Sequence, residues 1–326
     1  MPAAQERTIL AARPNAKENE TTVTPTNAAE AAAASPPRLL PLFGLAALAV
    51  VWGLSIPLTK LALRDIPPLT LTALRYGFAA PLFAPFLFRR PLPSRRALLL
   101  MAGLGALGVG LGQIAQMLGV QRTSAAVATV ISATIPMFVV ALAARRLGQP
   151  IRASQALGLV VALAGVAVVA AEGPAPTATL TVSAIAGDLL VLLSAICIAL
   201  YYVHGAEVSA RHSVIVMAGW SSIFGAVFLL PFAAAELAVS PVRFTAVGLG
   251  VALYLAALVT VAGMWVWLHC LRLLPARIAA ASQYAQPLVG VAASAALFDE
   301  SIGAAFAAGT ALVLAGVALT AWSPRR

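Results

Sequence analysis

Residues 153–171 read A-S-Q-A-L-G-L-V-V-A-L-A-G-V-A-V-V-A-A, a run of 19 residues with no charge and no proline. This is close to the length of about 20 residues that a helix needs to cross the hydrocarbon core of a bilayer. The run is continuously apolar rather than alternating, which excludes a strand of a membrane barrel. The stretch therefore predicts a transmembrane helix.

Similar runs fill the chain from Leu39 onward and are separated by short polar breaks. Of all residues 61% are hydrophobic and 10% are charged, whereas an ordinary soluble domain carries about 25% charged residues. A soluble fold could not bury so much apolar side chain. We predict an all-α integral membrane protein with ten transmembrane helices, at about 39–63, 69–88, 97–119, 124–144, 153–171, 185–204, 213–234, 246–270, 276–297 and 302–322.

The basic residues fit this number of spans. With the amino terminus inside, sixteen of the 21 Lys and Arg residues lie in inside segments. Three lie outside (Arg64, Arg122 and Arg243), and Lys60 and Arg75 fall within spans. Cytoplasmic loops carry such an excess of basic residues, so we expect both termini in the cytoplasm of a bacterial cell, with the chain in the inner membrane. The same placement argues against nucleic acid as the partner of a chain with net charge +10.

The chain also repeats itself. A shift of 151 residues places Pro136 on Pro287, and the run 164–167, Ala-Gly-Val-Ala, on the same run at 315–318. Five spans are an odd number, so a second copy must enter the membrane upside down. We expect two inverted five-helix repeats at 39–171 and 185–322, an arrangement found in secondary transporters. Residues 1–38 are polar and mixed in charge, which predicts a disordered cytoplasmic tail, and 323–326 form the cytoplasmic carboxyl terminus.

Several kinds of chemistry have no sequence signal. No carboxylate lies near the middle of a predicted span, which disfavours ion coupling through a carboxylate. No hydrolase, metalloprotease or magnesium–diphosphate motif is present, and the two cysteines have no metal-ligand spacing. We expect no enzyme activity, no cofactor and no metal.

Two polar features are candidates for a binding site. Arg75 lies about two turns into the second span, where it could snorkel to the outer interface beside Asp65 or attract an anionic substrate in a cavity. Lys60, nearer a helix end, is expected to snorkel. The fourth and ninth spans occupy matching positions and each contains a proline, which frees a backbone carbonyl. Near these prolines and near mid-span of the first helix lie the remaining candidates, Ser132, Thr134, Gln283, Tyr284, Gln286 and the aromatic wall residue Trp52.

Taken in order along the chain, these pieces resemble the EamA-type permeases of the drug/metabolite transporter superfamily over residues 39–322. The matching pieces are Trp52-Gly53, Leu74-Arg75-Tyr76, Thr123-Ser124-Ala125, Pro136, Gly187-Asp188-Leu189, Pro287, Asp299-Glu300 and the two Ala-Gly-Val segments. The resemblance implies ten helices, alternating access, and export or exchange of amino acids, related metabolites or drugs. The chain departs from the family pattern at Gln149 and Gln286, where the family often has glutamate, which argues against proton coupling through Gln286.

The leading hypothesis is therefore a carrier of small molecules embedded in membrane lipid, with Trp52, Arg75, Ser132, Thr134, Gln283, Tyr284 and Gln286 along its path. The alternatives are a membrane enzyme acting on lipid and a sensor without transport. The sequence leaves open the substrate, the direction of flux, the coupling ion, and whether the chain is a monomer or a homodimer.

Overall fold

The computed structural model describes residues 39–146, 151–172, 181–274 and 282–321. The predicted amino-terminal tail and the residues 323–326 lie outside these ranges. The described residues form helices and no strand. In chain order the helices are α2 (Leu39–Gly53), α3 (Ser55–Ala62), α4 (Pro68–Leu87), α5 (Arg95–Leu104), η1 (Gly105–Gly112), α6 (Gln113–Arg122), α7 (Ala125–Ser132), α8 (Ile135–Arg146), α9 (Ala153–Glu172), α10 (Val182–Ser209), α11 (Val214–Val239), α12 (Ala246–Tyr254), η2 (Leu255–Ala262), α13 (Gly263–Leu273), α15 (Ala285–Phe298) and α16 (Ala304–Ala321).

Within the described ranges, seven helical stretches are long and apolar enough to cross a membrane. They are Leu39–Ala62, Arg95–Arg122, Ala125–Arg146, Ala153–Ala171, Val182–Ser209, Val214–Val239 and Ala246–Cys270. Two shorter apolar helices, Ala285–Phe298 and Ala304–Thr320, follow them, and the 20 residues of α4 fill the second predicted range. The prediction of an all-α membrane protein is confirmed to this extent, whereas the number of ten spans stays a prediction.

Hydroxyl side chains mark where several helices begin. Ser94, Ser124, Thr181, Ser213 and Thr245 each accept a hydrogen bond from the backbone N–H three residues ahead. These bonds satisfy donors that a helix leaves unpaired at its first turn.

Carboxylates from distant segments complete two of the helix starts. Glu236 accepts bonds from the N–H groups of Leu69 and Thr70 in α4, and Glu300 accepts bonds from those of Ala125 and Ala126 in α7. Negative charge is favourable at a helix amino terminus. These two acids therefore connect helices as well as cap them.

Prolines interrupt three of the apolar runs. The helical path breaks at Leu54, at Ala133–Thr134 and at Tyr284, in each case two or three residues before a proline. A proline removes one backbone donor and crowds the preceding turn, which explains why α2 and α3, and α7 and α8, are separate elements. The prediction of prolines within the fourth and ninth runs thus corresponds to real breaks in the helices.

Two further irregularities are stretches of π-helix, η1 and η2. Each lies in the middle of an otherwise α-helical run, between α5 and α6 and between α12 and α13. Their first residues, Gly105 and Leu255, are 150 positions apart. Short π-helical segments within α-helices occur frequently at functional sites.

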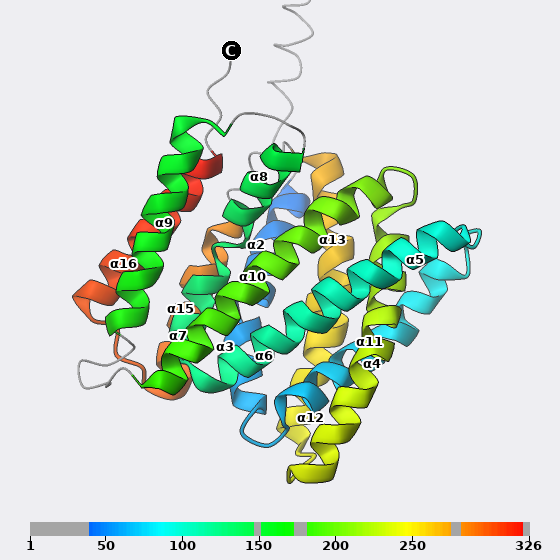
Figure 1. Cartoon of the computed structure of the whole chain (residues 1–326), viewed down its shortest axis with the longest axis horizontal. Coiled ribbons are helices and arrows are strands. Elements are labelled where there is room, and N and C mark those ends of the chain that lie inside the picture. The colour runs from blue at the N-terminus through cyan, green and yellow to red at the C-terminus, as the bar shows by residue number, and fades with distance from the viewer. Residues whose placement is uncertain (1–38, 147–150, 173–180, 275–281, 322–326) are drawn as a thin grey trace, which may run out of the picture. The chain divides into compact units, whose positions relative to one another are not determined.

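The main helix contacts join residues before the segment 173–180 with residues after it. Helix α4 packs on α11, α6 and η1 pack on α10, α2 packs on α13 and α15, and α7 packs on α15. Figure 1 shows α10 crossing beside α6, and α9 beside α16 at one edge of the bundle. The interior is thus built from both parts of the chain.

The α9–α16 pair has the most extensive contact between helices, and glycines make it possible. A Cβ atom on Gly165 would lie 2.6 Å from the carbonyl oxygen of Gly309, and one on Gly158 would lie 2.6 Å from that of Gly316. Small residues let the backbones of membrane helices approach closely. The glycines that the repeat brings into register, Gly158 with Gly309 and Gly165 with Gly316, thus lie in one interface.

The outer surface carries large apolar side chains. Leu157 and Val160 on α9 are 56% and 64% exposed, and Leu189 on α10 is 60% exposed. A surface of this kind is stable in contact with lipid and unfavourable in water.

Candidate functional site

Arg75 on α4 is buried between the two parts of the bundle. Its Nε donates to Thr260 Oγ1 on η2 at 3.1 Å, and its Nη1 donates to Gln113 Oε1 on α6 at 3.1 Å. The guanidinium carbon also lies 5.2 Å from the ring centre of Tyr76. Arg75 thus turns inward, and Asp65, its expected neighbour at the outer interface, instead accepts a hydrogen bond from Thr245.

The partners of Arg75 are neutral. No carboxylate of the described segments forms an ion pair with it. A guanidinium has five N–H donors and is always charged, and burying a cation in a membrane is costly. Arg75 therefore keeps N–H donors without a described partner, and a positive charge that no described carboxylate neutralises.

Trp52 contacts the same segment of η2. Its Nε1 donates to the carbonyl of Val259 at 3.0 Å, next to the Thr260 that binds Arg75. Its ring lies 5.8 Å from that of Trp267, at an interplanar angle of 48°. Trp52 thus bonds a carbonyl that lies within the π-helical stretch. The structure therefore brings Trp52 and Arg75 together through η2.

Gln283 and Gln286 lie on the other side of α2. Nε2 of Gln286 donates to Oε1 of Gln283. The backbone carbonyl of Gln286 lies against Gly53, where a Cβ atom would come within 2.7 Å of it. Only glycine permits this approach, which places the two glutamines beside the Trp52–Gly53 segment.

The remaining predicted site residues surround the break between α7 and α8. Tyr284 packs against the hydrophobic cluster that contains Ile131 and Met137. Thr134 is fully buried and donates to the carbonyl of Ile131 at 2.6 Å, which is a local structural bond. The hydroxyl of Ser132 is buried and has no hydrogen-bond partner among the described residues, so it is the one of this group with free capacity for a ligand.

Two partners of Arg75 were not among the predicted site residues: Gln113 and Thr260. The amide of Gln113 is visible in the sequence as a polar group within an apolar run, but a single hydroxyl such as Thr260 has no distinguishing pattern.

Lys60 on α3 has a role that the sequence did not predict. Its ammonium group does not reach outward, and instead donates to the carbonyls of Val120, Gln121 and Thr123 at 2.8, 3.0 and 2.6 Å. These carbonyls end α6, where a helix carries partial negative charge. Lys60 therefore links α3 to the connection between α6 and α7.

Replacing Lys60 by methionine is expected to lower the free energy of unfolding by about 2 kcal/mol, because three carbonyls lose a charged donor. Thermal unfolding of the purified protein in detergent, followed by circular dichroism, would measure the loss. Arg64→Met is the matched control, since Arg64 is exposed one turn further on and its guanidinium lies over the face of Phe298. Equal losses in the two variants would contradict this role for Lys60.

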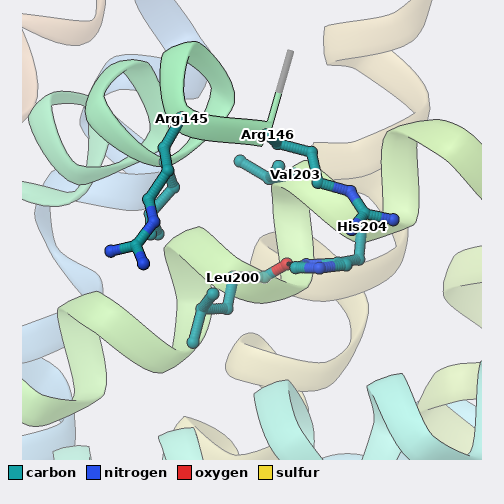
Figure 2. Close-up of a pocket in the computed structure, with 6 residues that line it drawn as sticks. Arg145, Arg146, Leu200, Val203 and His204 are labelled. Atoms are coloured by element: carbon teal, nitrogen blue, oxygen red, sulfur yellow. Dashed lines mark hydrogen bonds between the residues drawn. The ribbon is translucent and has the colours of Figure 1, made fainter. Parts of the chain in front are cut away.

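Two hollows lie away from these residues. One is lined by Leu142, Arg145, Arg146, Leu200, Val203 and His204, between α8 and α10, and is shown in Figure 2. The other lies between α9 and α10, and its walls are apolar except for Asp188. Within the described ranges, no three His, Cys, Asp or Glu side chains come close enough to hold a metal ion.

The all-helical bundle and its apolar outer surface identify the chain as a polytopic membrane protein. Its interior contains a buried cation, Arg75, that no described carboxylate neutralises. The family model of EamA-like transporters matches residues 39–171 and 185–322. The chain belongs to the EamA-like transporter family, as its motifs had indicated.

Curated relatives agree with this assignment. An uncharacterized transporter of Archaeoglobus fulgidus is 27% identical over 278 residues, which cover 84% of this chain and 95% of the relative. The uncharacterized inner membrane transporter YedA of Escherichia coli (strain K12) is 28% identical and covers 81% of this chain and 85% of its own length. A protein of Streptantibioticus cattleyicolor named as a probable terminal-alkyne amino-acid exporter is 30% identical over 83% of this chain and 89% of its own.

A solved crystal structure is similar with a TM-score of 0.53 and 21% identity, covering 84% of this chain and 94% of the other. At this identity the likeness supports the fold alone.

Proposed function

We propose that this chain is a secondary transporter that moves small molecules bearing an anionic group, amino acids foremost, across the bacterial inner membrane by alternating access. The observation that carries the proposal is Arg75, a buried guanidinium with neutral partners at the contact between α4 and η2. A carboxylate bound there would supply the missing negative charge. Trp52, Ser132, Gln283, Tyr284 and Gln286 are proposed to line the path, with Thr134 supporting the break beside them.

Two inverted five-helix halves are the proposed framework, and the helix contacts support it. A two-fold relation between the halves would exchange the first run with the sixth and the third with the eighth. Under this relation, the contact between α10 and α6 predicts a contact between α2 and α13. Both contacts are present. The π-helical stretches η1 and η2 occupy equivalent runs, 150 residues apart.

Lys60 supports the proposal that one side of the path is closed. It ties α3 to the end of α6 beside α7, on the side predicted to face outward. The segment of the second half that corresponds to α7, residues 276–283 by the shift of 151, lies mostly outside the described residues. A carrier closed on its outer side is one of the two states that alternating access requires.

The proposed substrate class rests on the positive charge of Arg75 and on the name of one relative. The relative from Streptantibioticus cattleyicolor is named as an amino-acid exporter, and an amino acid carries the carboxylate that Arg75 would bind. Export and the cytoplasmic location of both termini are parts of this proposal. Because Gln286 has no ionisable group, we propose that coupling does not proceed through it.

The decisive experiment has two stages. Purified protein is first screened for thermal stabilisation against L-amino acids, nucleosides and cationic drugs, since a ligand at a hundredfold excess over its Kd adds about 2.7 kcal/mol to stability. Hits are then tested for counterflow in proteoliposomes, with and without a pH gradient. Accumulation of an amino acid in sealed vesicles is the expected result. Binding without accumulation would contradict transport, and accumulation of cations alone would contradict the role of Arg75.

A further inference from the structure

The hollow between α8 and α10 combines basic and apolar walls. It has a volume of about 290 Å³ and is lined by Leu142, Arg145 and Arg146 from α8 and by Leu200, Val203 and His204 from α10. Figure 2 shows Arg145 on one side of the hollow and Arg146 with His204 on the other, with Leu200 between them. The two arginines point apart although they are neighbours in sequence.

The charges of the hollow do not cancel. Arg146 forms an ion pair with Glu207, with Nε 2.8 Å from Oε1 and Nη2 3.2 Å from Oε2. This bidentate contact neutralises the acid that stands beside the hollow. For Arg145 the described residues provide no hydrogen bond or ion pair to the side chain, so one positive charge remains open.

His204 adds a polar atom that faces away from its own helix. Its Nδ1 lies 2.9 Å from the carbonyl of Leu200, one turn earlier in α10. When Nδ1–H donates to this carbonyl, Nε2 accepts a hydrogen bond in the neutral ring and donates to a phosphate oxygen only in the charged ring, where both nitrogens carry a proton. The hollow therefore presents a guanidinium and an imidazole nitrogen above the leucine side chains.

The Leu200 side of the hollow lies on the face of α10 that continues to the exposed Leu193. Tyr201 and Cys197 on α10 pack against glycines of η1, Gly108 and Gly112, on the inner side. Leu200 lies on another face of α10, in line with the exposed Leu193, and His204 lies between the two faces. Because Leu193 and Leu200 are seven residues apart, they form one apolar stripe that leads from the basic end along the helix.

We propose that this hollow is a binding site for an anionic phospholipid, with the headgroup phosphate at Arg145 and His204 and one acyl chain along Leu200 and Leu193. Phosphate groups bind arginine through charge-assisted hydrogen bonds, and basic pockets between transmembrane helices hold the headgroups of anionic lipids. The apolar stripe favours a lipid over free phosphate, because free phosphate gains nothing from the leucines. Arg145 and Arg146 lie at the end of α8 that the basic-residue pattern places in the cytoplasm, which is the depth of a headgroup.

The test is lipid binding to the full-length protein, delipidated in detergent and followed by native mass spectrometry. The probes are 1-palmitoyl-2-oleoyl phosphatidylglycerol, phosphatidylcholine with the same chains, and inorganic phosphate as competitor. We expect Arg145→Gln to weaken phosphatidylglycerol binding about fivefold, the effect of one basic residue near an anionic headgroup. Arg145→Lys should retain most of the binding. Arg90→Gln is the matched control, because Arg90 is exposed on the same predicted side and lies outside the hollow.

Selective retention of phosphatidylglycerol, lost in Arg145→Gln and kept in Arg90→Gln, would support the site. Equal losses in both variants would overturn it, since they would show a general effect of surface charge. Equal binding of phosphatidylcholine would also overturn it, as would displacement of the lipid by millimolar inorganic phosphate, which would assign the hollow to free phosphate. Arg145 is exposed, so the variant is expected to fold normally, and its thermal unfolding would confirm this.

Discussion

Arg75→Gln is expected to raise the KM for an amino-acid substrate by tenfold or more, while the amount of folded protein in the membrane falls far less. A hydrogen bond to a charged group contributes about 1.5–3 kcal/mol, and glutamine would keep a polar contact with Thr260 or Gln113 but lose the charge. The measurement is counterflow in proteoliposomes at several substrate concentrations, for each amino acid that the unmodified protein carries. The pattern expected is a large change in KM with a smaller change in maximal rate.

Two variants separate binding from folding. Arg75→Lys keeps the charge and should recover part of the affinity. Arg243→Gln makes the same replacement at an exposed arginine before α12 and should leave KM unchanged. If Arg75→Gln lost transport only in proportion to lost folded protein, Arg75 would have a structural role and the proposed anion site would be wrong.

Gly165→Val is expected to lower the free energy of unfolding by about 3 kcal/mol or more. A Cβ atom at this position would lie 2.6 Å from the carbonyl oxygen of Gly309 and 2.7 Å from the backbone nitrogen of Val313. Backbone atoms cannot rotate away as a side chain can, so α9 and α16 would have to separate. Overpacking of this kind typically costs about 1–3 kcal/mol and occasionally more. The measurement is the midpoint of thermal unfolding in detergent.

Gly103→Val is the matched control for this substitution. Gly103 also lies in a helix, α5, but a Cβ atom there would meet no neighbouring atom within 4 Å. The control should therefore stay within about 0.5 kcal/mol of the unmodified protein, as surface substitutions usually do. Similar unfolding midpoints for the two variants would show that the close approach of α9 and α16 does not contribute to stability.

The helices could be predicted from the sequence because their signals are local. Apolar runs of membrane-spanning length, the polar breaks between them and the prolines within two of them predicted most element positions. The shift of 151 residues likewise anticipated that glycines in 153–171 and 302–322 are related, although it did not show that they face each other.

The candidate site was less predictable because it depends on how each helix is rotated. A run that is apolar on all sides gives no preferred face, so the sequence could not tell whether Arg75 turns toward Asp65 or toward Thr260. For the same reason Lys60 was expected at the interface, whereas its partners are carbonyls 60 and more residues away. The π-helical stretches have no sequence signal at all, since the residues of η2 would suit an ordinary α-helix.

Because η2 is π-helical, the number of residues in this segment matters independently of which residues they are. A π-helical turn accommodates one residue more than the α-helical turn it replaces. Deleting a single residue between Leu255 and Ala262 would therefore restore α-helix and leave the helix beyond it facing nearly the same way. Trp267 would stay beside Trp52, while the hydrogen bonds made within the stretch, between Arg75 and Thr260 and between Trp52 and the carbonyl of Val259, would be lost. In this helix a deletion would disrupt the candidate site and preserve the packing around it.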